Sequence, residues 1–157
     1  MVILLALVLA GCGSDRRADA VDESSGQVER TESIDALNLV LVTDGTGVAR
    51  LIGTLVNQAD EPDRLVGLDV DAEPPGYTVI FADGPYLLPE GEPLRLYRDA
   101  NVTLLSEAFV PGYRADVTLA FAGSEPLTTT VPVERNTGIY RDVEVRQPPD
   151  GDIRPGN

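Results

Sequence analysis

The sequence predicts an all-β protein, an antiparallel β-sandwich of immunoglobulin or cupredoxin-like type with roughly 8–9 short strands. Three observations favour this fold class. Apolar and polar residues alternate with a period of two through the middle of the chain, and the helical period is almost absent. Gly, Pro, Asn and Asp interrupt the alternation roughly every eight to twelve residues. The 157 residues are 43% apolar, which is enough for the core of one domain of ordinary size.

The strands are expected in order along the chain. Asp44-Gly45-Thr46-Gly47 is a strong turn signal, so the two runs beside it should pair antiparallel. The clearest strand is 113–122, where Val117 and Phe121 share a face that must be core. In the next run, residues 127–133, Pro132 indicates an edge position or a bulge. The runs are residues 36–43, 48–57, 65–70, 77–82, 94–96, 102–105, 113–122 and 127–133, with 139–145 as a last edge strand.

The N-terminus carries an apolar run over residues 2–10 that ends in Leu9-Ala10-Gly11-Cys12. The run is too short to span a bilayer, which takes about 20 residues, but it suits the hydrophobic region of a signal peptide. Its end resembles the lipobox of bacterial lipoproteins, in which the cysteine accepts a diacylglyceryl group. We therefore expect residues 1–11 to be a lipoprotein signal peptide and Cys12 to anchor the mature chain to the extracytoplasmic face of the cell membrane. The alternative is that Cys12 is a small apolar residue in a buried setting.

Composition divides the rest of the chain. Residues 12–33 hold almost no large apolar side chain and are expected to form a lipidated, flexible tether. Residues 34–146 should form the β-sandwich domain. Residues 147–157 are rich in Pro and Gly and are expected to be a disordered tail.

Charge and residue usage exclude several function classes. Twelve Lys+Arg against 26 Asp+Glu give a net charge of −14, so the chain has no basic face with which to bind the phosphates of nucleic acid or of anionic lipid. The chain has no His, one Cys and one Met, which excludes an imidazole base, a histidine-dependent triad and a thiolate cluster. We expect a protein that is not an enzyme and that holds no cofactor.

Two groups of residues are weak candidates for binding. Asp69, Asp71 and Glu73 place carboxylates at every second position, as a loop for a hard cation does, although the solvent face of a strand gives the same pattern. Tyr86, Tyr97 and Phe109 would line a partner-binding patch if their loops meet at one end of the sandwich. Ordinary core packing is the alternative for these aromatic residues.

Several segments of the chain carry a family resemblance. They are residues 49–57, Glu61-Pro62-Asp63-Arg64-Leu65-Val66-Gly67, Leu87-Leu88-Pro89-Glu90-Gly91, Val117-Thr118-Leu119 and Val131-Pro132-Val133. Together they resemble the PCu(A)C copper-chaperone family, and within it the actinobacterial lipoproteins of the LpqE type. The resemblance covers roughly residues 37–133 and implies a β-sandwich at the cell envelope.

The copper ligands that the resemblance implies are missing. The family holds Cu(I) with a His and a Met about eleven residues apart and a later His-x-Met, because Cu(I) prefers thioether and imidazole donors. The His-x-Met falls on Asn101-Val102-Thr103, and the first His falls near residues 77–79 with no substitute ligand. Met1 belongs to the expected signal peptide and Cys12 to the anchor. The resemblance thus implies the fold and the location, while the residues contradict the copper activity.

Two hypotheses for function remain. The first is a membrane-anchored envelope lipoprotein that presents a non-enzymatic binding or assembly module to an envelope protein partner. The alternative is a carrier of a metal or small ligand, related to copper chaperones, that uses hard oxygen donors.

Overall fold

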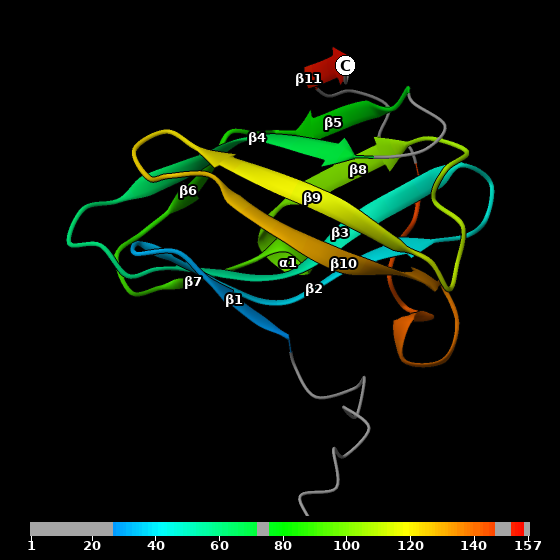
Figure 1. The fold of residues 1–157 in the computed structure, drawn as a ribbon, viewed down its shortest axis with the longest axis horizontal. Coiled ribbons are helices and arrows are strands. Elements are labelled where there is room, and N and C mark those ends of the chain that lie inside the picture. The colour runs from blue at the N-terminus through cyan, green and yellow to red at the C-terminus, as the bar shows by residue number, and fades with distance from the viewer. Residues whose placement is uncertain (1–26, 72–75, 147–151, 156–157) are drawn as a thin grey trace, which may run out of the picture.

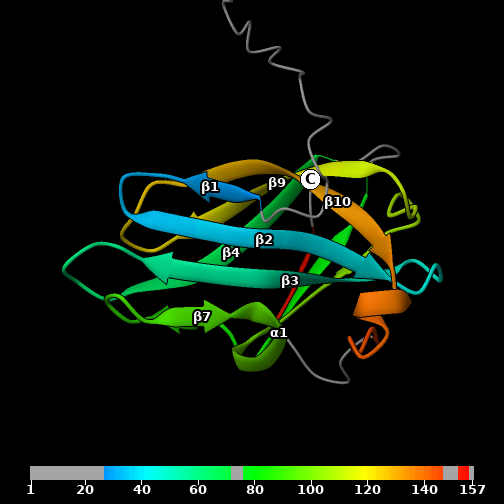
Figure 2. The ribbon, with the colours of Figure 1, turned by 90° about the horizontal axis from the view of Figure 1, so that it is seen from below.

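The computed structural model describes residues 27–71, 76–146 and 152–155. They form two β-layers that face each other (Figure 1), and the view from below separates β2, β3 and β7 from β9 and β10 (Figure 2). One short helix, α1 (Leu96–Asp99), and one 3₁₀ turn, η1 (Gly138–Tyr140), accompany the strands. The strands are β1 (Val28–Arg30), β2 (Ile34–Thr43), β3 (Val48–Asn57), β4 (Asp63–Asp71), β5 (Thr78–Ala82), β6 (Tyr86–Leu88), β7 (Pro93–Arg95), β8 (Asn101–Leu105), β9 (Arg114–Phe121), β10 (Leu127–Arg135) and β11 (Asp152–Pro155).

A single strand joins the two layers. The strand order is β11-β5-β8-β3-β2-β10-β9-β4-β6, with β1 added to β2 and β7 added to β3. Layer A contains β11, β5, β8, β3 and β2, and layer B contains β9, β4 and β6. Residues 127–132 of β10 pair antiparallel with β9, whereas residues 133–135 pair parallel with β2. The change of layer follows Pro132, whose missing N–H weakens further pairing in one sheet.

The predicted all-β sandwich is confirmed, with β10–β2 as the one parallel pair among the described strands. Eight predicted runs correspond to β2, β3, β4, β5, β7, β8, β9 and β10, and the hairpin at residues 44–47 is confirmed. The prediction of a strand at 139–145 is wrong, because η1 and turns occupy this segment. There, burial of Val143 rather than strand pairing accounts for the apolar spacing.

Three short strands were not predicted, so the structure has eleven strands rather than 8–9. β1 lies in the expected tether and pairs with β2, and β11 lies in the expected disordered tail and pairs with β5. β6 pairs with β4. Each has only three or four residues, too few for an alternation pattern, and exists because a longer strand offers it main-chain partners.

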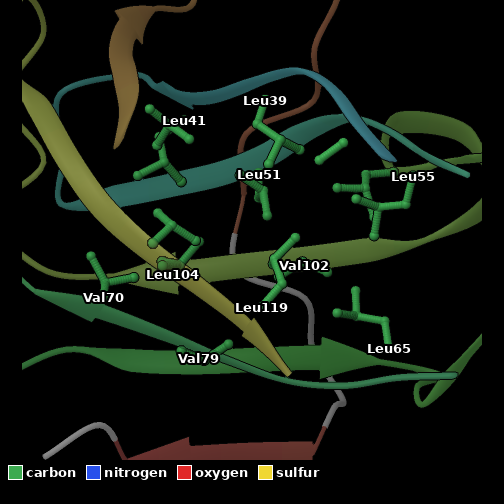
Figure 3. Close-up of a cluster of buried hydrophobic side chains, with 14 of the residues drawn as sticks. Leu39, Leu41, Leu51, Leu55, Leu65, Val70, Val79, Val102, Leu104 and Leu119 are labelled. Atoms are coloured by element: carbon green, nitrogen blue, oxygen red, sulfur yellow. The ribbon is translucent and has the colours of Figure 1, made fainter. Parts of the chain in front are cut away.

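The core fills the space between the layers with aliphatic side chains (Figure 3). Layer A contributes Leu41, Leu51 and Leu104, and layer B contributes Leu65 and Leu119, all of them fully buried. These positions follow the predicted alternation of each strand, because side chains one residue apart point to opposite faces.

A β-bulge in β2 changes which of its residues face the core. Leu37 pairs with Thr54 and Val40 pairs with Ile52, so Asn38 and Leu39 together lie opposite Gly53. Only glycine fits there, because its φ is +129° and a Cβ would lie 2.8 Å from Leu39 Cδ2. The extra residue moves Leu39 into the core and leaves the next residue, Val40, on the outer face of layer A.

Two buried polar side chains hold the loops at the end of β3. Asn57 is fully buried, and its Nδ2 donates to the carbonyl oxygens of Glu61 (2.7 Å) and Leu88 (3.2 Å). The carboxylate of Asp63 accepts backbone N–H groups from Gly123 and Ser124, both at 2.8 Å. These bonds tie the β3–β4 connection to β6 and to the β9–β10 hairpin.

The same hydrogen bonds lower the pKa of the Asp63 carboxyl group. Burial alone raises the pKa, but the hydrogen bonds from the Ser124 hydroxyl and from the backbone of Arg64, Gly123 and Ser124 outweigh it, so the pKa lies below its ordinary value of 3.8. The ionised form is therefore favoured by folding.

We predict that Asp63→Ala lowers the free energy of unfolding by about 2 kcal/mol at pH 7, because buried backbone donors lose their acceptor. Since the folded pKa is depressed, this contribution is complete above pH ~4 and fades as the pH falls through the folded pKa. Urea unfolding at pH 7 and pH 3 measures it, with exposed Glu61→Ala as the control. An equal loss for both variants at pH 7 would contradict the assignment.

Candidate functional site

The positions of the expected His-x-Met lie on β8, on the outer face of layer A. Val102 and Leu104 point into the core, so Asn101 and Thr103 point outward. Thr103 is only 1% exposed, and its Oγ1 donates to Asn101 Oδ1 at 3.0 Å. The two side chains satisfy each other rather than an external ligand.

A buried arginine lies directly across the sheet from Thr103. Arg50 of β3 is the cross-strand partner of Thr103 and is 9% exposed. Its guanidinium donates to the carbonyl oxygens of Tyr97 (3.2 Å), Ala100 (3.1 Å) and Glu144 (3.2 Å) and lies 5.5 Å from the centre of the Tyr97 ring. Within the described ranges no carboxylate pairs with it, and its Nε has no hydrogen-bond partner. The positive charge of Arg50 therefore faces main-chain carbonyl oxygens rather than a carboxylate.

Arg50 also holds the C-terminal segment, residues 136–146, on layer A. Val143 of this segment packs on Val40 and Val42, the two outward residues that follow the bulge. The Tyr97 hydroxyl donates to the carbonyl oxygen of Asp142 at 2.7 Å, beside the Arg50–Glu144 bond. A small apolar cluster and two polar bonds thus cover the outer face next to Asn101 and Thr103.

These residues do not fit a copper ion. An amide and a hydroxyl replace the soft donors that Cu(I) prefers, and they are bonded to each other. A fixed guanidinium beside them opposes any further cation. No residue of the chain supplies imidazole, since it contains no His.

The region expected for the first His has a structural role. Tyr77 is 6% exposed, its hydroxyl donates to the Asp69 carboxylate, and the same oxygen accepts the backbone N–H of Val70 at 3.1 Å. The side chains of Tyr77 and Asp69 therefore fasten the β4–β5 connection to the edge of β4.

The hard-cation candidates lie on the outer face of layer B. Asp69 and Asp71 are exposed on β4, and Asp71 lies directly opposite Asp116 of β9, whereas Glu73 lies outside the described residues. Asp69, Asp71 and Asp116 line an open hollow together with Thr118 and Thr128. Where the chain is described, no three His, Cys, Asp or Glu side chains are arranged to hold a metal ion.

The predicted aromatic patch is wrong. Tyr86 is 7% and Phe109 is 4% exposed, so both belong to the core, and only Tyr97 reaches the surface at 42% exposure. The Tyr86 hydroxyl accepts the backbone N–H of Asn101 at 2.9 Å and donates to the carbonyl oxygen of Ala82. Burial raises the pKa of Tyr86, and the backbone bond to Asn101 lowers it by less. These rings stabilise the fold rather than a partner surface.

The predicted anchor residue, Cys12, lies outside the described residues. In the part of the chain that is described, no helix has the length and apolar character needed to cross a membrane.

Comparisons with known proteins support the fold. No protein-family model and no curated protein sequence matches the chain. Solved structures that resemble it include the apo PCuAC domain from PmoF1, with a TM-score of 0.57, 19% identity, and coverage of 69% of this chain and 99% of that chain. The copper-bound PCuAC domain from PmoF2 has a TM-score of 0.56 and 24% identity, with coverage of 69% of this chain and 98% of that chain. The apo PmoF2 PCuAC domain has a TM-score of 0.55 and 21% identity, with coverage of 71% of this chain and 98% of that chain. The chain therefore has a PCuAC-like fold.

Sequence reasoning overlooked the buried polar residues that organise this region. Asn57 and Asp63 stand inside the segments that carried the family resemblance, and the structure shows that they fix loops. Arg50 gave one available signal, since it is a charged residue between Ala49 and Leu51 in a strand. The sequence alone does not show that Arg50 is buried, because the segment that covers it is 94 residues away in sequence.

We predict that Arg50→Met lowers the free energy of unfolding by about 2 kcal/mol, because three carbonyl oxygens, one buried and two part-buried, lose charged donors. Hydrogen exchange of residues 140–146 should rise more than exchange of β9, since Arg50 holds this segment. Exposed Arg64→Met is the matched control. Unchanged exchange in residues 140–146 would contradict the role of Arg50.

We predict that Asp71→Asn stabilises the protein by a fraction of 1 kcal/mol at low ionic strength, because like charges directly opposite on β4 and β9 repel. The gain in melting temperature should disappear in 1 M NaCl, where the Debye length is about 3 Å. The same measurement with millimolar Ca²⁺ tests the predicted cation site. A rise in the wild-type melting temperature that EDTA reverses would favour that site over simple repulsion.

Proposed function

We propose that the protein is a membrane-anchored envelope lipoprotein that presents a PCuAC-like β-sandwich as a non-enzymatic binding or assembly module for another envelope protein. The observation that carries the proposal is the replacement of the soft copper donors by Asn101 and Thr103, bonded to each other beside Arg50. A scaffold related to copper chaperones is retained while its donor set is absent.

The anchor rests on the sequence. An apolar run of signal-peptide length ends in Leu9-Ala10-Gly11-Cys12. Two or three acyl chains on Cys12 would hold the protein at a membrane without a spanning helix. The LpqE-type lipoproteins, which the sequence resembles, suggest an actinobacterial envelope as the setting.

A binding role without catalysis fits the residues available. The chain has no His, and its single Cys is the expected acylation site, so neither an imidazole base nor a free thiolate is present after maturation. The PCuAC domain of PmoF2, whose fold resembles that of this chain, has been solved with copper bound. The alternative for this chain is a carrier of a hard cation through Asp69, Asp71 and Glu73, and the opposed pair Asp71–Asp116 is the one feature that favours it.

We predict that in-cell crosslinking of the full-length, tagged protein captures one dominant envelope protein, and that Cys12→Ala abolishes the capture by releasing the protein from the membrane. Mass spectrometry of the crosslinked species and of the N-terminal peptide measures partner and acylation together. Gly13→Ala, which retains the cysteine, is the control. An unmodified Cys12 would refute the anchor, whereas acylation without a partner above background would refute the module.

A further inference from the structure

The two ends of the sandwich differ strongly in charge. The end formed by loops 31–33, 58–62, 89–92 and 122–126, here called the acidic end, is one connected surface. The backbone N–H of Glu32 donates to Glu125 Oε1 at 3.2 Å, and that of Gly91 donates to the Asn57 carbonyl oxygen at 2.9 Å. These loops contain no Lys or Arg and carry six exposed carboxylates, on Glu32, Asp60, Glu61, Glu90, Glu92 and Glu125.

The opposite end, here called the apolar end, is formed by loops 44–47, 106–113 and 136–142. In Figure 1 these loops lie at the right, away from the β9–β10 hairpin at the left. The backbone N–H of Ser106 donates to the Gly47 carbonyl oxygen and that of Asn136 to the Thr43 carbonyl oxygen, at 2.9 and 2.8 Å, so the loops are joined.

Exposed apolar side chains gather at this end. Tyr113 is 68%, Ile139 86% and Val110 47% exposed, which is half of the six large apolar side chains found exposed on the described surface. In the described loops and at their borders the charges balance, because Asp44, Glu107 and Asp142 accompany Arg114, Arg135 and Arg141. Exposed apolar residues without excess charge are typical of a contact surface.

The described chain begins beside the middle of β2. β1 runs antiparallel to β2, Val28 pairs with Leu37, and the backbone N–H of Asn38 donates to the Gln27 carbonyl oxygen at 2.8 Å. Gln27 Oε1 accepts a hydrogen bond from Arg114 Nη2 at 3.4 Å, next to Tyr113. The fourteen residues 13–26 separate Gln27 from Cys12 and reach at most about 50 Å.

We propose that the apolar end rests on the lipid surface, with Val110, Tyr113 and Ile139 at the headgroup boundary. The inference rests on the proposed lipid anchor, which keeps the whole domain within reach of the membrane. The exposed apolar side chains and the charges then select the apolar end. A tyrosine with an apolar ring and a polar tip suits that boundary.

Electrostatics selects the same orientation. Strand β2 has ten residues and is therefore about 33 Å long, several times the Debye length of about 8 Å at physiological salt. With the apolar end on the lipid, the six carboxylates of the acidic end are screened from anionic headgroups. The reverse orientation would press them against the lipid phosphates.

Single-tryptophan variants test the orientation, because the chain has no Trp. Full-length lipidated protein carrying Tyr113→Trp or Leu87→Trp is inserted into vesicles of brominated phosphatidylcholine and phosphatidylglycerol. Leu87 is 50% exposed on β6, next to the acidic end, and serves as the matched control. We expect bromine to quench Trp at position 113 about twofold, since interfacial side chains lie about 5–10 Å deep, and to leave Trp at position 87 unquenched. Adding Ile139→Asp should remove most of the quenching at position 113.

The outcomes separate this inference from the anchor. Protein that floats with the vesicles but shows no quenching at position 113, or equal quenching at both positions, keeps the anchor and overturns the orientation. Loss of quenching at position 113 when an envelope extract is added, without release from the vesicles, would assign this end to a protein partner instead. Protein that does not float overturns the anchor and the orientation together.

Discussion

The bulge at Asn38 and Leu39 is the constraint on which the rest of the architecture depends. β2 is the strand of layer A that borders the crossover strand β10, with β3 on one side and β1 and β10 on the other. In a regular strand without the bulge, Leu41 would lie on the face opposite to Ile34 and would point toward solvent. Gly53 makes the bulge possible, since any Cβ there would collide with Leu39 and with the Asn38 carbonyl oxygen. A single glycine therefore sets which side chains of β2 form the core.

The bulge also creates the second apolar surface of the domain. Val40 and Val42 point outward after it, and Val143 covers them from the C-terminal segment. Because this cluster is small, the segment needs polar bonds as well, and Arg50 and Tyr97 supply them. Local geometry in β2 thus determines where the end of the domain is held, and the buried guanidinium completes that arrangement.

The sequence pattern predicted the strands that are long and that bury only one face. β9 alternates over its whole length, and the β2–β3 hairpin has glycines where the turn needs positive φ, so both were predictable. β1, β6 and β11 were not, because they are too short for an alternation pattern and main-chain pairing with a longer strand defines them. The aromatic patch failed for a related reason. Tyr86 in the three-residue strand β6 and Phe109 in a loop belong to no stretch long enough for a period that reveals their side, and the structure shows both to be buried.

Arg50 lies beside the positions at which the resemblance expects copper ligands, so its charge opposes a cation there in addition to the lack of soft donors. Fold similarity places backbone, whereas metal affinity depends on donors and charge. A cation about 7 Å from the guanidinium would be opposed by about 2 kcal/mol at an effective dielectric constant of ~20. Changing Asn101 and Thr103 alone would leave that repulsion in place. Removing Arg50 would leave the carbonyl oxygens of Tyr97, Ala100 and Glu144 without their donor. In this chain the guanidinium that opposes a cation beside Asn101 and Thr103 also binds the Glu144 carbonyl oxygen and so holds the C-terminal segment on layer A.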